Sequence, residues 1–375
     1  MLRELLSGVL AGTISGILPG IHVNTLGAFL ATAGIGGNLL LFSMGLTHTF
    51  LDVVPSAFLG VPDEGTALGI LPAHRLVLRG RAMEVVRIAL WASFLAVFMT
   101  ILISPVYPVL AGAYTPKIGR TVVCFLAVFL ILTEGGLKKL HAALVFILSG
   151  LFGVLAFWLP LRQPYYHLFT GLFGLPVLIT AIVNGTGSLS GGDGKIRMDL
   201  KRFIGFSFLG TLLGMMASLI PAFTASQAAL IGSFLSRDER SFLTVVFSVN
   251  TANFLFSFVN FLETRRVRNG IVALMTPDAV GFLPYYALAA LFVSLLVLSY
   301  GEPLAAIILK ALSRVPYRLL NGAVVVALLL LSLYFDGLLG LLVLTGGAMI
   351  GLLAMGLGVK RTNCMGVLML QIIIG

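Results

Sequence analysis

Long apolar stretches separated by short polar connections make up most of the chain. A helix that crosses a membrane needs about 20 mostly apolar residues. Stretches of that kind lie near residues 2–18, 83–110, 119–135, 139–160, 165–184, 203–220, 281–300, 303–335 (with a break expected near Arg318) and 337–357, and a shorter one covers 362–375. The pattern predicts an all-α polytopic membrane protein with about ten transmembrane helices.

Residues 19–82 have a different pattern, because this apolar segment is interrupted repeatedly by proline and glycine. Pro19-Gly20, Pro55, Pro62 and Pro72 stand within it. Proline ends or kinks a helix since it lacks an N–H and clashes with the preceding turn. At membrane depth, broken backbone is tolerated only where it is buried in protein or lines a wet cavity. We therefore expect broken or re-entrant helices here.

The composition excludes several classes of protein. Of the 375 residues, 59% are hydrophobic and 10% are charged, whereas a soluble domain carries about 25% charged residues. So few charges cannot cover a surface that faces water. A soluble enzyme, a disordered protein and a secreted disulfide scaffold are excluded. We expect a multi-pass protein of the cell membrane, with the lipid bilayer as its main partner.

The net charge of +10 would suggest nucleic acid in a soluble protein. Here the basic residues lie at the ends of apolar stretches, where lipid headgroups and the positive-inside bias account for them. We expect no nucleic-acid partner. Cys124 and Cys364 lie in apolar stretches without metal-ligand spacing, so no metal site is expected. The acids Glu84, Asp238 and Glu239 are expected to be solvated charges at helix ends.

An internal repeat appears at a shift of 202 residues. The run GVLAGTISGILPGIHVNT, from Gly8, pairs with GTLLGMMASLIPAFTASQ, from Gly210. His48-Thr49 pairs with Asn250-Thr251, and HLFTGLFGLPVLI, from His167, resembles NCMGVLMLQIII, from Asn363. Several matches in the same order along both halves indicate a duplication.

The repeat predicts two transmembrane units, 1–185 and 203–375, joined by a polar linker at 186–202. The linker is rich in glycine, serine and basic residues, and it lacks the GxxxxGK[ST] spacing of a phosphate loop. With an odd number of spans in each half, the second repeat would be inverted relative to the first. Paired halves with broken helices are the architecture of secondary transporters, whose site lies between the repeats.

The sharpest local motif is LPGIHVNT, residues 18–25, with its counterpart IPAFTASQ, residues 220–227. Proline ends one helix, and hydroxyl and amide side chains stand where a new helix would begin. The start of a helix offers unpaired N–H groups to an anion. The alternative is a packed kink whose polar groups only satisfy the backbone. The predicted substrate-binding residues are Pro19, Gly20, His22, Asn24, Thr25, Pro221, Thr224, Ser226, Gln227, Asn250 and Thr251.

A second group of polar residues suits ion coupling. His48 and Asp52 are four apart and share a helix face, and ionisable groups at membrane depth are costly. Asp52 could bind Na⁺ or carry a proton, although a buried hydrogen-bonded pair is the alternative. No catalytic role is expected for them. The predicted ion-coupling residues are His48, Thr49, Asp52, Asp63, Glu64 and Asn253.

The segment Phe58 to Leu90 adds a cluster of basic residues. Arg75, Arg79 and Arg81 could collect an anion at the mouth of a pathway. The alternative is an amphipathic interfacial helix with its arginines extended toward water.

GTISGILPG, VPDEGTALGILPAHRLVLRGRA and the long apolar helix after it resemble the large membrane subunit of tripartite tricarboxylate transporters. Pro19-Gly20 and Gly80-Arg81-Ala82 match that pattern, whereas Asp63 replaces a glycine and Ala222 replaces the motif glycine of the second half. The resemblance is strongest over residues 8–100 and fits a compact, archaeal-type member. It implies uptake of organic polycarboxylates driven by an ion gradient. A periplasmic binding protein or a small membrane subunit is a compatible partner that the resemblance does not require, and a homodimer is a further open alternative.

The leading functional hypothesis is a secondary-active transporter for an organic anion. Na⁺ or H⁺ would be the coupling ion, and no other cofactor is expected. The alternative is a translocase for a lipid phosphate such as a polyprenyl phosphate, since helix N-termini and arginines suit phosphate equally well. An intramembrane enzyme is a third candidate, but the chain shows no Ser/His dyad or paired aspartates at usable spacing, so an enzyme is not expected.

Overall fold

The computed structural model describes residues 1–19, 23–61, 66–113, 115–184, 189, 191–220, 224–236, 238–267, 269–276 and 282–374, and these are almost entirely helical. The first part of the chain forms α1 (Leu2–Ile17), α2 (Val23–Thr32), α3 (Asn38–Leu51), α4 (Val53–Leu59), η1 (Ala67–Gly69), α5 (Ile70–Leu78), α6 (Ala82–Ile103), η2 (Ser104–Val106), α7 (Tyr107–Ala113), α8 (Pro116–Leu132), α9 (Lys138–Trp158), α10 (Pro164–Phe169), η3 (Thr170–Gly174) and α11 (Leu175–Asn184).

The second part begins inside the predicted linker, where the Asp199 carboxylate accepts hydrogen bonds from the N–H groups of Lys201 and Arg202 and caps the next helix. Its elements are α12 (Leu200–Leu219), α13 (Ala225–Leu235), α14 (Glu239–Thr264), α15 (Gly270–Ala273), η4 (Phe282–Tyr286), α16 (Ala287–Leu312), α17 (Tyr317–Gly356), η5 (Arg361–Met365) and α18 (Gly366–Ile374). η3 and η4 are single π-helical turns.

Within the described residues, 8 helices are long and apolar enough to cross a membrane, so the chain is an all-helical polytopic membrane protein. Two of them, Asn38–Leu59 and Glu239–Thr264, are absent from the predicted spans. The first is entirely buried and the second almost so. Because these helices do not face lipid, they carry polar residues that weaken the apolar signal by which a span is recognised.

The predicted break near Arg318 corresponds to residues 313–316, but the helices on either side differ from the prediction. α16 continues through Pro303 to Leu312. α17 begins at Tyr317 and is interrupted only at Asp336 and Gly337, whose backbone angles are not helical. The stretches predicted separately at 281–300 and 303–335 therefore divide at a different place.

Close helix packing occurs at equivalent places in the two halves. α1 packs on α3, and α12 packs on α14, and these are the two most extensive helix contacts. A Cβ on Gly8 or Gly12 would collide with the backbone of α3, and one on Gly210 or Gly214 would approach the backbone of α14 too closely. These glycines lie 202 residues apart. A duplication would produce such contacts, and the unit boundaries at 185 and 203 stay a prediction.

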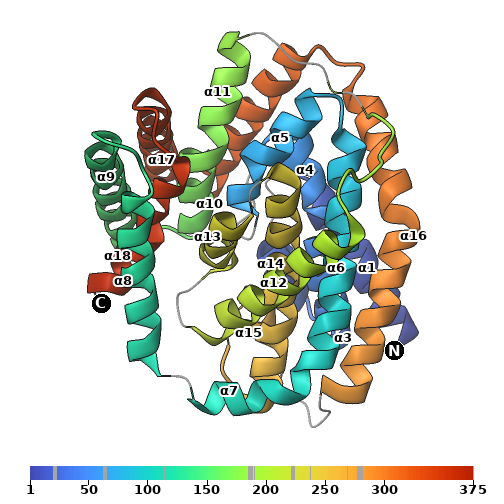
Figure 1. Cartoon of the computed structure of the whole chain (residues 1–375). Helices are drawn as coiled ribbons and strands as arrows, with labels where there is room; N and C mark the ends of the chain where they lie inside the picture. The colour runs from blue at the N-terminus through green and yellow to red at the C-terminus, as the bar shows by residue number, and fades with distance from the viewer. Residues whose placement is uncertain are drawn as a thin grey trace.

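The helices form two groups (Figure 1). One contains α1, α3, α6, α12, α14 and α16, and the other contains α8, α9, α17 and α18 with α10 and α11 packed on α17. Each group draws helices from both halves of the sequence. The shorter segments α4, α5 and α13 lie between the two groups in this view.

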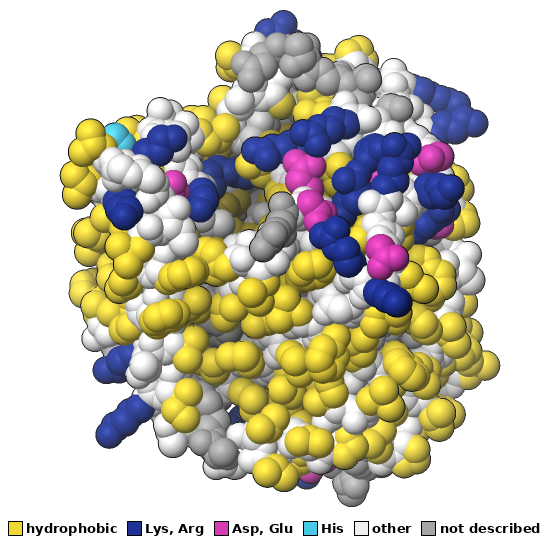
Figure 2. All heavy atoms as spheres, viewed as in Figure 1, with side chains coloured by type: hydrophobic (Ala, Val, Ile, Leu, Met, Phe, Trp, Pro, Cys, Tyr) yellow, Lys and Arg dark blue, Asp and Glu magenta, His cyan; other side chains and the backbone are white. Residues whose placement is uncertain are grey.

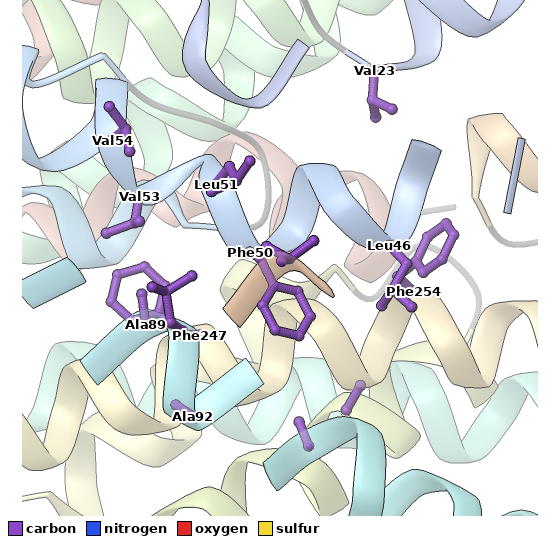
Figure 3. Packing of buried hydrophobic residues seen from close by; sticks show 14 of the residues in the cluster. Val23, Leu46, Phe50, Leu51, Val53, Val54, Ala89, Ala92, Phe247 and Phe254 are labelled. Carbon is purple, nitrogen blue, oxygen red and sulfur yellow. The ribbon is translucent and has the colours of Figure 1, made fainter. Parts of the chain in front are cut away.

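The core and the surface have the chemistry expected of a membrane protein. Phe50 of α3 and Phe247 of α14 lie in the apolar core where these helices approach α6 (Figure 3). Apolar side chains cover the lower part of the face shown in Figure 2, and most charges on that face collect above them. This surface fits a lipid-facing belt with a charged rim.

Candidate functional site

A buried polar contact joins α3 to α14. Thr49 and Thr251 are 202 residues apart, and their hydroxyl oxygens lie 3.1 Å from each other. The Thr251 hydroxyl is also 2.8 Å from that of Ser93 on α6. Both threonines are buried. Equivalent residues of two repeats contact each other only near the axis that relates the repeats, so a contact at the repeat distance is what the predicted duplication would give at its centre.

Asp52 extends this polar contact by one helical turn. It stands between the two helices, as the C-cap of α3 and the N-cap of α4. Asn250 Nδ2 of α14 donates to Asp52 Oδ2 at 2.7 Å, and the Ser56 hydroxyl donates to the Asp52 carbonyl. The Asp52 residue is 1% exposed. The structure thus places Asp52, Asn250 and the threonine pair together.

His48 lies beside this group and contacts α1. Its Nδ1 is 3.1 Å from the Ser15 hydroxyl, and both residues are buried. Asn253 is half-buried on α14, and its backbone lies beside Gly214 of α12. These two predicted ion-coupling residues therefore lie on α3 and α14.

The start of α13, where an anion site is predicted, carries a capping box. Thr224 caps the helix: its hydroxyl accepts from the Gln227 N–H, and the Gln227 side-chain oxygen accepts from the Thr224 N–H. Ser226 and Gln227 are fully buried. Gln227 Nε2 has no hydrogen-bond partner among the described residues. This amide nitrogen can therefore donate to a bound ligand.

The equivalent start of α2 is described only in part. Pro19 follows α1 after its cap residue Leu18, and α2 begins at Val23. The Asn24 side chain packs against the backbone of Gly270 at the start of α15. Gly20, His22, Asp63, Glu64 and Pro221 lie outside the described residues, as does the side chain of Thr25.

The three arginines predicted at the mouth each contact an acid. Arg79 is 2.9 Å and Arg75 is 3.8 Å from the Glu239 carboxylate, and Arg81 is 3.4 Å from Glu84. Glu84 was predicted to be solvated, and that was wrong, because the residue is only 1% exposed.

Glu84 is buried between the linker and the helices, and its carboxylate bonds to both. Its carboxylate accepts from the Arg240 side chain at 2.7 Å and from the Arg197 N–H at 2.9 Å. The Met83 N–H donates to the Gly191 carbonyl. The linker therefore lies against the start of α6 rather than free in solution.

Comparison with known proteins gives the family. The tripartite tricarboxylate transporter TctA family matches residues 2–366. The chain belongs to the TctA family. An uncharacterized protein of Methanocaldococcus jannaschii is 31% identical over 290 residues, which cover 72% of this chain and 71% of that protein. No solved structure matches.

Members of the TctA family are membrane components of tripartite transporters rather than enzymes. With the helices described above, membership makes this chain a multi-pass integral protein of the cell membrane and a transporter component.

Two acidic residues that were not among the predicted site residues each contact the opposite half of this TctA-family chain. Glu134 follows α8 and Asp336 interrupts α17; their numbers differ by 202. Each contacts the start of the last helical segment in the opposite half. We call Glu134 and Asp336 the crossed acids.

Asp336 contacts the start of α10. Its carboxylate accepts from the N–H groups of Arg162 and Gln163, the latter at 3.0 Å, and lies 2.7 Å from His167 Nε2. His167 Nδ1 is 3.0 Å from the Ser332 hydroxyl of α17. The His167 side chain is 0% exposed and that of Asp336 is 3% exposed. An acid of the second half thus holds the residues that lead into a helix of the first.

Glu134 makes the reciprocal contact at the start of η5. Its Oε1 accepts from the Lys360 N–H at 2.8 Å and from Asn363 Nδ2 at 3.2 Å. The sequence carried one usable signal for these contacts: both acids stand at the repeat distance, next to a glycine, between two apolar stretches.

Proposed function

We propose that this chain is a secondary-active transporter for a carboxylate-bearing organic anion. An Na⁺ or H⁺ gradient would drive it, and it would work as the large membrane component of a tripartite system. Membership of the TctA family supports the substrate class. The predicted inversion of the second repeat is part of this proposal, because alternating access follows from two repeats packed around one site.

The observation that carries the proposal is the buried polar contact between α3 and α14. Asp52, Thr49, Asn250 and Thr251 come from both halves and bond across a junction that is otherwise apolar. Buried polar groups in a membrane are costly, so they mark functional positions more often than packing positions. The site would therefore lie where the two repeats meet.

Asp52 suits the coupling role because its contact with Asn250 tolerates a change of charge. An amide N–H can donate to a carboxylate, and it can also donate to the carbonyl oxygen of a protonated acid. The contact between α3 and α14 would therefore persist whether Asp52 is ionised or protonated. Thr49, Thr251 and Asn250 add oxygen atoms of the kind that hard cations prefer.

The start of α13 suits the anion. The capping box holds Gln227 in place through its oxygen, which leaves the buried Nε2 as a donor. The partial positive charge of the helix start also favours a bound anion. The substrate would then be bound by neutral donors, with Asn24 and Ser226 in the corresponding first turns of α2 and α13.

The test is transport of radiolabelled citrate into proteoliposomes under an imposed Na⁺ or proton gradient. Asn24→Ala combined with Ser226→Ala should abolish uptake, because both helix starts lose a polar group. Asp52→Asn should leave citrate exchange but remove its dependence on the gradient. Asp193→Asn, in the exposed part of the linker, is the matched control and should behave as wild type.

Full citrate uptake by the double variant would exclude the paired helix starts as the site. Unchanged gradient dependence in Asp52→Asn would make Asp52 structural. If the wild type moves no citrate but transfers a polyprenyl phosphate between leaflets, the lipid translocase replaces the carrier.

A further inference from the structure

Three consecutive residues at the start of η5 carry buried polar atoms without a hydrogen-bond partner among the described residues. They are Nε of Arg361, Oγ1 of Thr362 and Oδ1 of Asn363. The great majority of buried polar atoms in native proteins are bonded. An unmet atom on each of three successive residues therefore indicates a place where another group binds.

Arg361 is the charged member of this set, and its described partner is neutral. Its Nη1 donates to the carbonyl of Phe173 at 2.8 Å. Other arginines, such as Arg87, Arg202 and Arg240, each contact a carboxylate. Within the described residues no carboxylate contacts Arg361. A guanidinium removed from water without a counter-charge is costly.

A second cation lies near Arg361. Burial lowers the pKa of Arg361 to about 10, and the positive charge of nearby Arg75 acts in the same direction. The Arg75 side chain is 54% exposed and reaches Glu239 only at 3.8 Å. The pair thus consists of one exposed and one deeper cation, and like charges held together are stabilised by an anion between or beside them.

The place in the fold suits a ligand that the two halves share. Phe173 belongs to the π-helical turn of α10–η3–α11 in the first half, and Arg361 begins the last helical segment of the second. Arg75 lies on α5, whose preceding turn η1 contacts η3. Segments from both halves therefore meet at this point.

We propose that Arg361 and Thr362, with Arg75 nearby, bind one anionic group of the transported ligand. Since Nη1 is held by the Phe173 carbonyl, the other edge of the guanidinium presents the N–H groups of Nε and Nη2 in parallel. That edge fits the two oxygens of a carboxylate or of a phosphate. The Thr362 hydroxyl can donate to the same group. The inference rests on the proposed function only in taking the ligand to be the transported anion.

The test measures binding without any gradient. Purified wild-type protein is heated in detergent with increasing citrate, and its unfolding midpoint should rise. Arg361→Gln should need at least about tenfold more citrate for the same rise, because a charge-assisted bidentate contact is lost. Arg361→Lys should fall between the two, since an ammonium group is a point donor. Thr362→Val should need a few-fold more, and it keeps Arg361 in place.

Arg318→Gln is the matched control. Arg318 also donates to a backbone carbonyl, that of Ile182, but it is exposed. This variant should keep the citrate response of the wild type. Circular dichroism and gel filtration of Arg361→Gln establish that its fold is intact, and if it is not, Thr362→Val provides the measurement.

A second arm identifies the source of the anionic group. The same variants are placed in vesicles with and without a polyprenyl phosphate. Stabilisation by that lipid, lost in Arg361→Gln, would support the site with a lipid phosphate as ligand. A citrate and lipid response that is equal in wild type and Arg361→Gln would overturn it. If citrate binds through Arg361 but is not transported, the proposed function fails and this inference stands. If Arg361→Gln binds and transports citrate as the wild type does, this inference fails and the proposed function stands.

Discussion

The contact of Asp336 with the first half and that of Glu134 with the second perform one task with different chemistry. Each carboxylate meets the N–H groups at the start of a helical segment from the opposite half. Asp336 adds a histidine that is bonded in turn to Ser332, whereas Glu134 adds an asparagine. The contact of Asp336 therefore includes a ring that can ionise, whereas the contact of Glu134 includes an amide that cannot.

If the halves are repeats, this difference separates what the duplication kept from what it left free to vary. Both halves place an acid against the backbone just before a helical segment of the other half, and losing the acid would leave those N–H groups without this partner. The side chain beside the acid differs between halves, and this is where one half can acquire a response to pH that the other lacks.

Removing the acids should give the largest effects. Asp336→Ala should lower the free energy of unfolding by about 3–4 kcal/mol, because two backbone N–H groups and a buried imidazole lose their shared partner. Glu134→Ala should cost about 1–2 kcal/mol, since one backbone N–H and an amide lose theirs. Unfolding in mixed micelles with increasing sodium dodecyl sulfate measures both, with Asp193→Ala as the exposed control. Equal costs would remove the proposed asymmetry.

Substituting the glycine beside each acid should have a smaller effect on the free energy of unfolding, and the two glycines should differ in that effect. Gly337 has φ 60° and ψ −149°, a conformation that is nearly restricted to glycine, so Gly337→Ala should cost about 2–3 kcal/mol. Gly136 has φ 55°, so Gly136→Ala should lower the free energy of unfolding by about 1 kcal/mol. A Cβ at either position meets no atom within 4 Å, so the unfolding free energies report the backbone alone. A larger cost at Gly136 would contradict the expected order.

Substituting the side chain beside each acid should give the smallest effect, which should appear as a change of the unfolding midpoint with pH. His167 faces Asp336 and Ser332, and the ring of Tyr166 packs against it. In His167→Asn, the difference in unfolding midpoint from wild type should vary with pH, because the imidazole can change its charge and the amide cannot. Asn363→His should introduce a pH dependence at the other contact. A difference that is the same at every pH would show that His167 keeps one charge state.

Much of the fold could be predicted because lipid and helix packing impose strong patterns. Apolar length predicted most spans, and the glycine spacing at Gly8 and Gly12 recurred where α12 packs on α14. The two fully or largely buried spans escaped that reasoning, since a helix surrounded by protein need not be uniformly apolar.

The central polar group could be predicted in part, and the crossed acids could not. His48, Thr49 and Asp52 stand out because ionisable and hydroxyl groups are rare within apolar stretches. Glu134 and Asp336 stand at the ends of such stretches, where charges are ordinary, and their partners lie in the opposite half. Arg361 was overlooked for the same reason, because its burial depends on the contact with Phe173 and not on its neighbours in sequence.

The contact between Thr49 and Thr251 has a consequence for ancestry. If the two halves descend from one half-length chain that paired with itself, this position once faced its own copy across a two-fold axis. A residue in that position must be complementary to itself. A hydroxyl satisfies that condition because it donates and accepts, whereas two carboxylates would repel each other. After gene fusion the two copies could mutate independently. An acid such as Asp52 could then occupy a position beside the axis, opposite a different residue.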